Sequence, residues 1–289
     1  MTGMELDRVT QILAQVEDIP TLSTTVTHVL RIVDDPNCSV TQLGRIVAGD
    51  PPLAARVLRL ANSAFYGFPR AISAVPQAIT LLGFATLRNV ALSVSVFDLF
   101  RAGRGQQIDL EALWRHSIGV AAAAKLIARR VRFTPIEKAF TAGLLHDLGK
   151  VIIVRYLTGS IESIMELIVT ENITIGEAEQ RVLSIAHPAF GAWLAARWAF
   201  PPSLVDAIAF HHNPGQAEDN IPLSSIISLA DLIAHRADIG SGGDKVPREP
   251  DPVALQALAL TEMDVDELCE ALSARKDDIE AFAAALGKH

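Results

Sequence analysis

Short apolar stripes at helical spacing, separated by proline and glycine, constrain the fold of this chain more than any other feature. After Pro20, apolar residues recur every three or four positions, as on one face of a helix, until Asp35-Pro36. Similar stripes follow Ser39, which we expect to cap a helix, and Pro52. Hydrophobic residues make up 50% of the 289 residues but aromatic residues only 6%, a balance that favours packed helices over aromatic-rich strands. We therefore predict an all-α fold.

The polar, glycine-containing stretch Arg101–Asp109 lies between two strongly apolar segments and is the best candidate for a boundary. We predict two packed helical subdomains, residues 1–105 and 106–240. Residues 241–289 then comprise the rest of a loop, Ile239–Pro252, and C-terminal helices that pack on the core.

Two C-terminal helices are predicted, Val253–Leu260 and Val265–Leu286, the second starting behind Asp264 as its cap. In the second subdomain, Val151–Tyr156 is rich in β-branched residues and is compatible with a strand. We predict a helix there because the neighbouring segments are helical.

Several classes of protein are disfavoured by composition. Cys38 and Cys269 lie far apart without a CxxC partner, which argues against a disulfide framework or a thiolate zinc site. The net charge of −8 argues against general nucleic-acid binding. The longest apolar stretches, such as Val90–Phe97 and Ile118–Ala124, are shorter than the roughly 20 residues of a membrane-spanning helix. Since Met1–Pro20 shows no signal peptide, we expect a cytoplasmic protein that does not insert into a membrane.

Histidines and aspartates in apolar helical surroundings form the chemically informative set of the second subdomain. They are His116, His146, Asp147, His187, His211, His212 and Asp231. Imidazole nitrogens and carboxylate oxygens suit divalent Fe, Mn, Zn or Mg rather than soft, thiolate-binding metals. Adjacent helical residues diverge by about 100°, so His146 and Asp147 could bind one metal together or bridge two.

Any one of these histidines, taken alone, is better explained as a core residue satisfied by hydrogen bonding. The two aspartates change this balance, because a buried carboxylate costs several kcal/mol unless it is paired or bound to metal. Asp147 and Asp231 both lie in aliphatic helical segments. We therefore predict a shared polar pocket that holds one or two metal ions or is empty.

The order of these residues resembles the HD-domain superfamily of metal-dependent phosphohydrolases. His116, the His146-Asp147 pair and Asp231 follow one another as in that superfamily. The additional histidines of the set resemble the extra ligands of its binuclear HD-GYP branch. The HD-GYP signature itself is absent, because Asn213-Pro214-Gly215 follows the histidine pair.

A series of shorter motifs extends over roughly Ile19 to Ala237. These motifs are, in order, Ile19-Pro20, Gly49-Asp50-Pro51 leading to Leu53, Arg56-Val57-Leu58, Ala61-Asn62-Ser63-Ala64-Phe65-Tyr66-Gly67, Ala78-Ile79 with Leu82-Gly83, Ala142 to Lys150, Trp198 with Pro201, and His211-His212. Together they resemble, more specifically, the HDOD (HD-related output domain) family.

This resemblance implies that the second subdomain is an HD-domain-like helical bundle and that the metal ligands are the seven residues given above. HDOD proteins act in bacterial signalling, commonly without demonstrated hydrolysis. The resemblance therefore implies a regulatory module that binds a signalling protein in trans and a nucleotide or phosphate ligand. No fused output segment is evident in the sequence, and no oligomeric state is predicted.

The alternative is a metal-dependent phosphohydrolase or phosphodiesterase. In that case Asp147 would bridge two metals, and Lys150 matches the lysine that contacts phosphate in active HD enzymes. Lys150 is equally compatible with a solvated lysine near a helix break.

The stretch Asn62–Gly67 is compatible with a binding site, but we prefer a helix end capped by Gly67, with Phe65 and Tyr66 sealing the bundle. The tryptophans, including Trp114, are expected to pack between helices.

Overall fold

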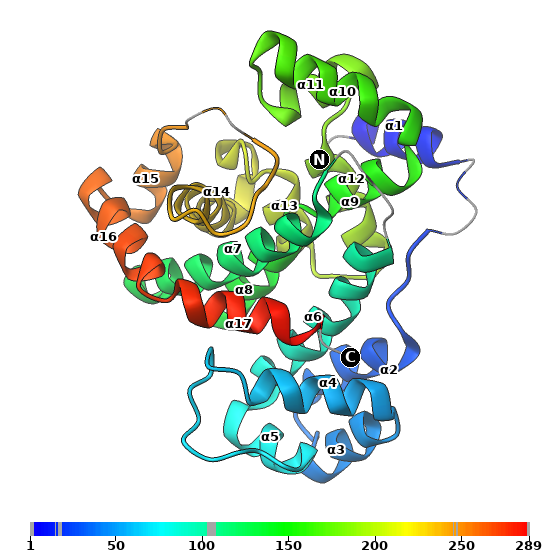
Figure 1. The fold of residues 1–289 in the computed structure, drawn as a ribbon, viewed down its shortest axis with the longest axis vertical. Coiled ribbons are helices and arrows are strands. Elements are labelled where there is room, and N and C mark those ends of the chain that lie inside the picture. The colour runs from blue at the N-terminus through cyan, green and yellow to red at the C-terminus, as the bar shows by residue number, and fades with distance from the viewer. Residues whose placement is uncertain are drawn as a thin grey trace. The chain divides into compact units, whose positions relative to one another are not determined.

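The computed structural model describes residues 3–14, 16, 19–102, 108–244, 246 and 248–287, and their regular elements are all helices (Figure 1). The α-helices are α1 (Gly3–Leu13), α2 (Thr24–Val33), α3 (Val40–Ala48), α4 (Pro51–Ala61), α5 (Val75–Leu82), α6 (Phe84–Ala102), α7 (Leu110–Arg130), α8 (Ile136–Leu145), α9 (Leu148–Tyr156), α10 (Thr158–Glu171), α11 (Ile175–Leu183), α12 (His187–Arg197), α13 (Pro202–Ala209), α14 (Ile221–Arg236), α15 (Pro252–Leu258), α16 (Glu262–Ser273) and α17 (Lys276–Ala285). Two short 3-10 helices, η1 (Pro214–Gln216) and η2 (Glu218–Asn220), lie between α13 and α14. The predicted all-α fold is confirmed.

The segment with a possible strand, Val151–Tyr156, is the main part of α9, as predicted. Helix α1 was not predicted from the sequence, and it packs against α12. Of the proposed boundary Arg101–Asp109, residues 103–107 lie outside the described residues.

The described residues form two compact units. The larger comprises those within Met1–Ile19 and Phe100–Ala274, and the smaller those within Pro20–Leu99 and Arg275–His289. Helix α1 therefore groups with the larger unit and α17 with the smaller one. The predicted segments 1–105 and 241–289 instead keep each of these helices with its neighbours in sequence.

In the smaller unit, polar side chains start the helices. Ser23, Ser39 and Asp50 each accept a hydrogen bond from the backbone N–H three residues later, which satisfies an otherwise unpaired donor. The predicted cap at Ser39 is confirmed.

The stretch after α4 corrects one detail of the sequence interpretation. Gly67 does adopt a left-handed φ of 64°, but α4 ends earlier, with Asn62 at its C-cap. The Asn62 amide accepts a hydrogen bond from Ile72 N at 2.7 Å and donates one to Ile72 O at 2.8 Å. The ring of Phe65 packs on Phe282 of α17, with centroids 5.0 Å apart. These contacts support the predicted structural role.

The larger unit is organised around α7, which contacts both α8 and α14. A Cβ on Gly143 of α8 would lie only 2.8 Å from Ala121 Cα of α7, so glycine permits this close helix contact. Helices α9 and α12 meet in the same way, because a Cβ on Gly149 would lie 1.8 Å from the carbonyl oxygen of His187. Glycine at these two positions brings the chain around Asp147 next to His187.

The single predicted helix Val265–Leu286 is wrong. The structure has two helices there, α16 and α17, and the cap of α16 is Thr261, with Asp264 completing a capping box from the N3 position. The helix ends where the chain passes between the two units. Arg275, at this break, donates to the carbonyl of Phe65 at 3.3 Å and covers its ring. Helical periodicity does not reveal these contacts, which lie at the break.

No single helix among the described residues has both the length and the apolar character needed to cross a membrane. The pair α5 and α6 reaches both together, but it is bent by 120°.

Candidate metal centre

His146 and Asp147 lie at the junction of α8 and α9, where His146 is the C-cap of one helix and Asp147 the N-cap of the next. Both side chains are buried. Nδ1 of His146 lies 2.8 Å from the carbonyl oxygen of Gly143, one turn earlier, so Nδ1 carries the proton. Nε2 is left without a hydrogen-bond partner.

His211 repeats this arrangement at the end of α13. Its Nδ1 lies 2.7 Å from the carbonyl oxygen of Ile208, and its buried Nε2 has no partner. Two imidazoles from distant segments thus donate from Nδ1 in the same way, which leaves the buried Nε2 atom of the neutral ring with an unused lone pair. This is the orientation that a metal-ligating histidine needs.

His187 is the first residue of α12 and is held by Glu179 of α11. The Oε2 atom of Glu179 lies 2.7 Å from both the backbone N and the Nδ1 of His187. Glu179 is buried and was missed in the sequence analysis. A carboxylate behind a histidine fixes its orientation and increases the basicity of the other nitrogen.

His116 of α7 and Asp231 of α14 meet across the contact between these helices, with Nε2 and Oδ1 2.9 Å apart. Nε2 of His146 lies 3.9 Å from the same Asp231 oxygen. Ligand atoms of His116, His146 and Asp231 all lie within 4.8 Å of one another.

A second group is formed by His187, His211 and His212, again with ligand atoms within 4.8 Å of one another. The Nε2 atoms of His187 and His212 are 3.1 Å apart.

Asp147 lies between these groups. Its Oδ2 is 3.3 Å from His146 Nε2 and 4.0 Å from His116 Nε2, whereas its Oδ1 is 3.3 Å from His187 Nε2 and 3.9 Å from His211 Nε2. The structure thus brings all of the predicted ligands together.

Two cations approach the carboxylates. Lys150, which is only 3% exposed, donates to Asp147 Oδ2 at 2.8 Å and to the carbonyl oxygen of Gly242 at 2.7 Å. The alternative of a solvated lysine is therefore wrong. Arg248 was not identified from the sequence, and its Nη1 lies 3.0 Å from Asp231 Oδ2.

The cations determine the ionisation of the two acids. Burial acts to raise the pKa of Asp147, but His146 and Lys150 outweigh it and hold this pKa well below its ordinary value. Burial likewise acts to raise the pKa of Asp231, and Arg248 is the main group that holds it well below its ordinary value. Both carboxylates are therefore ionised at neutral pH.

The histidines divide into two classes. Burial, followed by neighbouring imidazoles, lowers the pKa values of His211 and His212 well below the ordinary value, so both are neutral at pH 7. Burial acts in the same direction on His146, but the Asp147 carboxylate outweighs it and raises the pKa of His146. Because a metal binds only the neutral imidazole, the affinity of this position for metal falls as the pH drops through the raised pKa of His146.

The chemistry of the centre fits one or two divalent metal ions. Buried polar atoms without a hydrogen bond are rare in folded proteins, yet Nε2 of His146, Nε2 of His211 and Oδ1 of Asp147 are all of this kind. Each is a lone-pair donor directed at the same small region. Nitrogen and oxygen donors of this type suit Zn, Fe or Mn.

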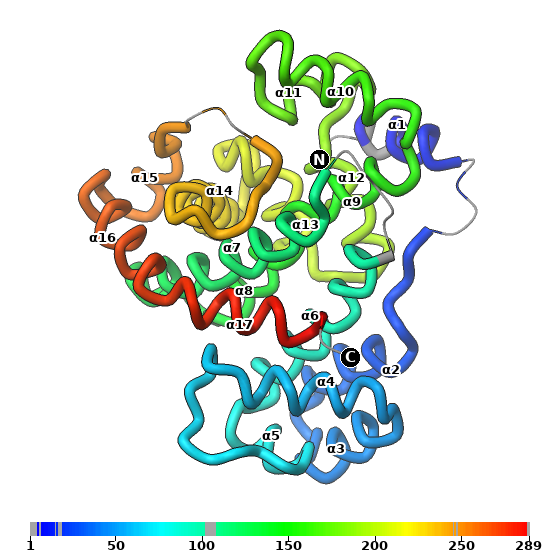
Figure 2. Tube along the Cα trace, viewed as in Figure 1, coloured from blue at the N-terminus to red at the C-terminus, as the bar shows by residue number. Residues whose placement is uncertain are grey.

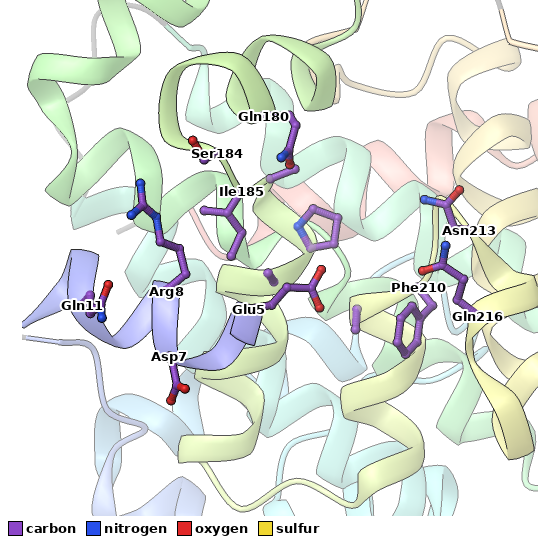
Figure 3. A pocket seen from close by; sticks show the side chains of 14 residues that line it. Glu5, Asp7, Arg8, Gln11, Gln180, Ser184, Ile185, Phe210, Asn213 and Gln216 are labelled. Atoms are coloured by element: carbon purple, nitrogen blue, oxygen red, sulfur yellow. The ribbon is translucent and has the colours of Figure 1, made fainter. Parts of the chain in front are cut away.

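A cavity of about 780 Å³ lies on the neighbouring surface, lined by residues of α1, the α11–α12 connection and the end of α13 (Figure 3). Ala186 and Pro188, on either side of His187, line it, as does Phe210. None of the predicted ligands is among its lining residues. The cavity is therefore a feature separate from the candidate metal centre.

Comparison with known proteins agrees with this fold. The sequence profile of the HDOD domain matches residues 19–214. A solved HDOD domain protein of unknown function from Geobacter sulfurreducens is 29% identical, with a TM-score of 0.85 and 98% of each chain covered. A proposed phosphohydrolase from Shewanella amazonensis SB2B is 27% identical, with a TM-score of 0.76, covering 95% of this chain and 97% of that one.

An uncharacterised protein of Treponema pallidum (strain Nichols) is 24% identical over 236 residues, which is 81% of this chain and 45% of the relative. This chain spans less than half the length of the curated relatives that it matches.

Proposed function

Because this chain belongs to the HDOD domain family, we propose that it is a cytoplasmic regulatory module whose state is set by a divalent metal centre and read by a signalling protein in trans. The metal ligands are His116, His146, Asp147, His187, His211, His212 and Asp231. The observation that carries this proposal is the paired environment of Asp147, with unpartnered imidazole nitrogens on both sides of one buried carboxylate.

A regulatory role is favoured over hydrolysis because the centre is closed. The described side chains around Asp147 are buried, and both acids are already neutralised by Lys150 and Arg248. A substrate phosphate would have to displace these contacts before it could react. A phosphate or nucleotide that only competes with the two carboxylates for these cations would instead act as a ligand that changes the state of the module. Two free cysteines are consistent with a reducing compartment.

The proposal is tested by thermal unfolding of the protein in the presence of a chelator and of Mn²⁺, Fe²⁺, Zn²⁺ or Mg²⁺. A metal that binds the folded state at 100 times its Kd stabilises it by about 2.7 kcal/mol. Stabilisation should be lost in Asp147→Asn and retained in Asp206→Asn, which removes a carboxylate that accepts a hydrogen bond from Asn220. Equal stabilisation of both variants contradicts the proposal, as does the absence of stabilisation in both the native chain and Arg248→Gln, which lacks the cation at Asp231.

The output in trans is tested by using the metal-loaded and the chelated protein as baits in a lysate of the host. We expect a signalling protein to be retained by one of the two forms. Identical retention by both forms contradicts regulation by the metal.

A second candidate, a metal-dependent phosphohydrolase, is favoured by the position of Asp147 between the two ligand groups and by Lys150 beside it. Bound metals would supply a water of lowered pKa and a clamp for phosphate oxygens. Metal-dependent cleavage of a cyclic dinucleotide or a bis-aryl phosphate that disappears in Asp147→Asn would establish this function. Metal binding without cleavage would support the regulatory function instead.

A further inference from the structure

The connection between α14 and α15 runs against the candidate metal centre. We call its described residues 239–244, 246 and 248–250 the strap; it is the orange loop between these helices in Figure 2. Its start is fixed on α7, where Ser241 N donates to the carbonyl oxygen of Ala112 at 3.0 Å. Gly240 adopts a φ of 65°, and a Cβ there would lie 2.3 Å from both Ala112 O and His116 N. The strap therefore approaches α7 more closely than a larger residue at this position would allow.

Gly242 brings the strap onto the centre itself. Its carbonyl oxygen accepts a hydrogen bond from Lys150 Nζ at 2.7 Å. A Cβ on Gly242 would lie 3.1 Å from His116 Nε2, one of the predicted ligand atoms. The backbone of the strap at Gly242 therefore lies directly against His116 and Lys150.

Asp244 ties the strap to two helices. Its Oδ1 accepts a hydrogen bond from Ile175 N at the start of α11 at 2.7 Å, and its carbonyl oxygen lies 3.2 Å from Nε2 of His235. Its Oδ2 lies 3.6 Å from Arg248 Nη2 and so helps to orient the guanidinium. His235 of α14 thus supports the strap.

Arg248 connects the strap to the two groups of predicted ligands. Its Nη1 lies 3.0 Å from Asp231 Oδ2 and 3.4 Å from His212 Nδ1, so one cation contacts members of both ligand groups. Nε of Arg248 is buried without a hydrogen-bond partner. A guanidinium is held here by charge, although part of its hydrogen-bonding capacity is unused.

We propose that Arg248 takes the place of a metal cation at Asp231, so that metal binding and strap closure exclude each other. The inference rests on the proposed metal centre and adds its regulation. The single negative charge of the Asp231 carboxylate cannot fully compensate both a buried guanidinium and a metal ion at the same time. Metal binding therefore releases Arg248, opens the strap, and exposes a segment that a partner can read. The metal-free form is closed.

The first test is a titration with Mn²⁺, followed by calorimetry, of the native protein, Arg248→Gln and Arg130→Gln. Arg130 is the matched control because it pairs with two acids of α16, Asp264 and Glu267, and with no residue of the strap. We expect the Kd for Mn²⁺ to fall by roughly tenfold in Arg248→Gln, equivalent to about 1.4 kcal/mol, and to stay unchanged in Arg130→Gln. Arg248→Lys retains a cation, keeps Asp231 neutralised should the glutamine variant fail to fold, and should give an intermediate Kd.

The second test distinguishes displacement from a simple electrostatic effect, because loss of a nearby positive charge alone increases metal affinity. Hydrogen exchange of the strap amides is measured in the native protein with chelator and with Mn²⁺. We expect Mn²⁺ to accelerate exchange at Ser241 and Gly243, while α7 exchanges no faster. Unchanged or slower exchange in the strap overturns the proposal, even if Arg248→Gln binds metal more tightly.

These outcomes separate the inference from the proposed function. Equal Mn²⁺ affinity in the native protein and Arg248→Gln, with an unchanged strap, overturns only the inference. No Mn²⁺ binding by either protein overturns both. Binding by Arg248→Gln alone supports both, since the native strap would then be the barrier.

Discussion

The Oδ1 atom of Asp147 lies 3.3 Å from Nε2 of His187, on the opposite oxygen of the carboxylate from His146. One side chain therefore connects the α8–α9 junction to the start of α12. The contact depends on Gly149, which lets the backbone of α9 approach the carbonyl of His187. This relationship joins two groups of histidines into one centre.

Replacing Asp147 by Asn should destabilise the metal-free protein. The substitution leaves Lys150 and the imidazoles around it without their buried counter-charge, and breaking a buried ion pair in this way costs about 3 to 5 kcal/mol. The free energy of unfolding in urea with chelator present measures this loss. The control Asp206→Asn should lose no more than about 1.5 kcal/mol, as for an ordinary hydrogen bond. A loss of the same size in both variants would contradict a role for the Asp147 carboxylate as the buried counter-charge of Lys150 and the imidazoles.

Replacing Glu179 by Gln should weaken metal binding while preserving the fold. Glutamine has nearly the same shape, but it offers a neutral acceptor to His187 in place of a carboxylate. Loss of such a supporting group typically lowers metal affinity by about 10- to 100-fold. Calorimetric titration with Zn²⁺ or Mn²⁺ gives the Kd, and circular dichroism verifies the fold. An unchanged Kd would show that His187 is not a ligand.

Replacing Gly149 by Ala should be among the most damaging small substitutions in the chain. The added Cβ would lie 1.8 Å from the carbonyl oxygen of His187, so α9 and α12 must separate. We expect a loss of more than about 4 kcal/mol in the free energy of unfolding. The control Gly159→Ala lies in α10 with no atom within 4 Å of the new Cβ, and its effect should stay within about 1 kcal/mol. Similar stability of the two variants would contradict the tight contact.

Much of this centre could be predicted from sequence because its residues are chemically conspicuous. Asp147 and Asp231 lie in apolar helical segments, where an unpaired carboxylate is too costly to be incidental. Helical periodicity was sufficient to predict the all-α fold, because amphipathic stripes report burial directly.

Glu179 and Arg248 could not be predicted by the same reasoning. Glu179 lies in an ordinary amphipathic helix, and only the turn between α11 and α12 brings it back to His187. Arg248 lies in a segment without periodicity, so its contact with Asp231 depends on the path of the strap through space. The break between α16 and α17 was not predicted either, because the apolar pattern continues across it while Arg275 at the break contacts Phe65, which is distant in sequence.

The start of α16 should show a distinct acid sensitivity. Hydrogen bonds from the side chain and backbone of Thr261, with a further one from Arg130, lower the pKa of Asp264 from 3.8 to about 2. A depressed folded-state pKa contributes stability above the unfolded-state value, and this contribution is lost as the pH falls through the folded-state value. Asp264→Asn should therefore be less stable than the native protein at pH 7, and the difference should shrink between pH 4 and pH 2. Thermal melts across this range measure it, and a pH-independent difference would contradict the assignment.

Occupancy of the metal centre can be measured by inductively coupled plasma mass spectrometry of the purified protein after incubation with Mn²⁺, Fe²⁺ or Zn²⁺ and removal of excess ion. We expect about one or two equivalents of one of these metals, in the native protein or after release of the strap in Arg248→Gln, and their loss in Asp147→Asn. Less than about 0.2 equivalents in both the native protein and Arg248→Gln would contradict the proposed function, because the folded protein would then lack a working metal site.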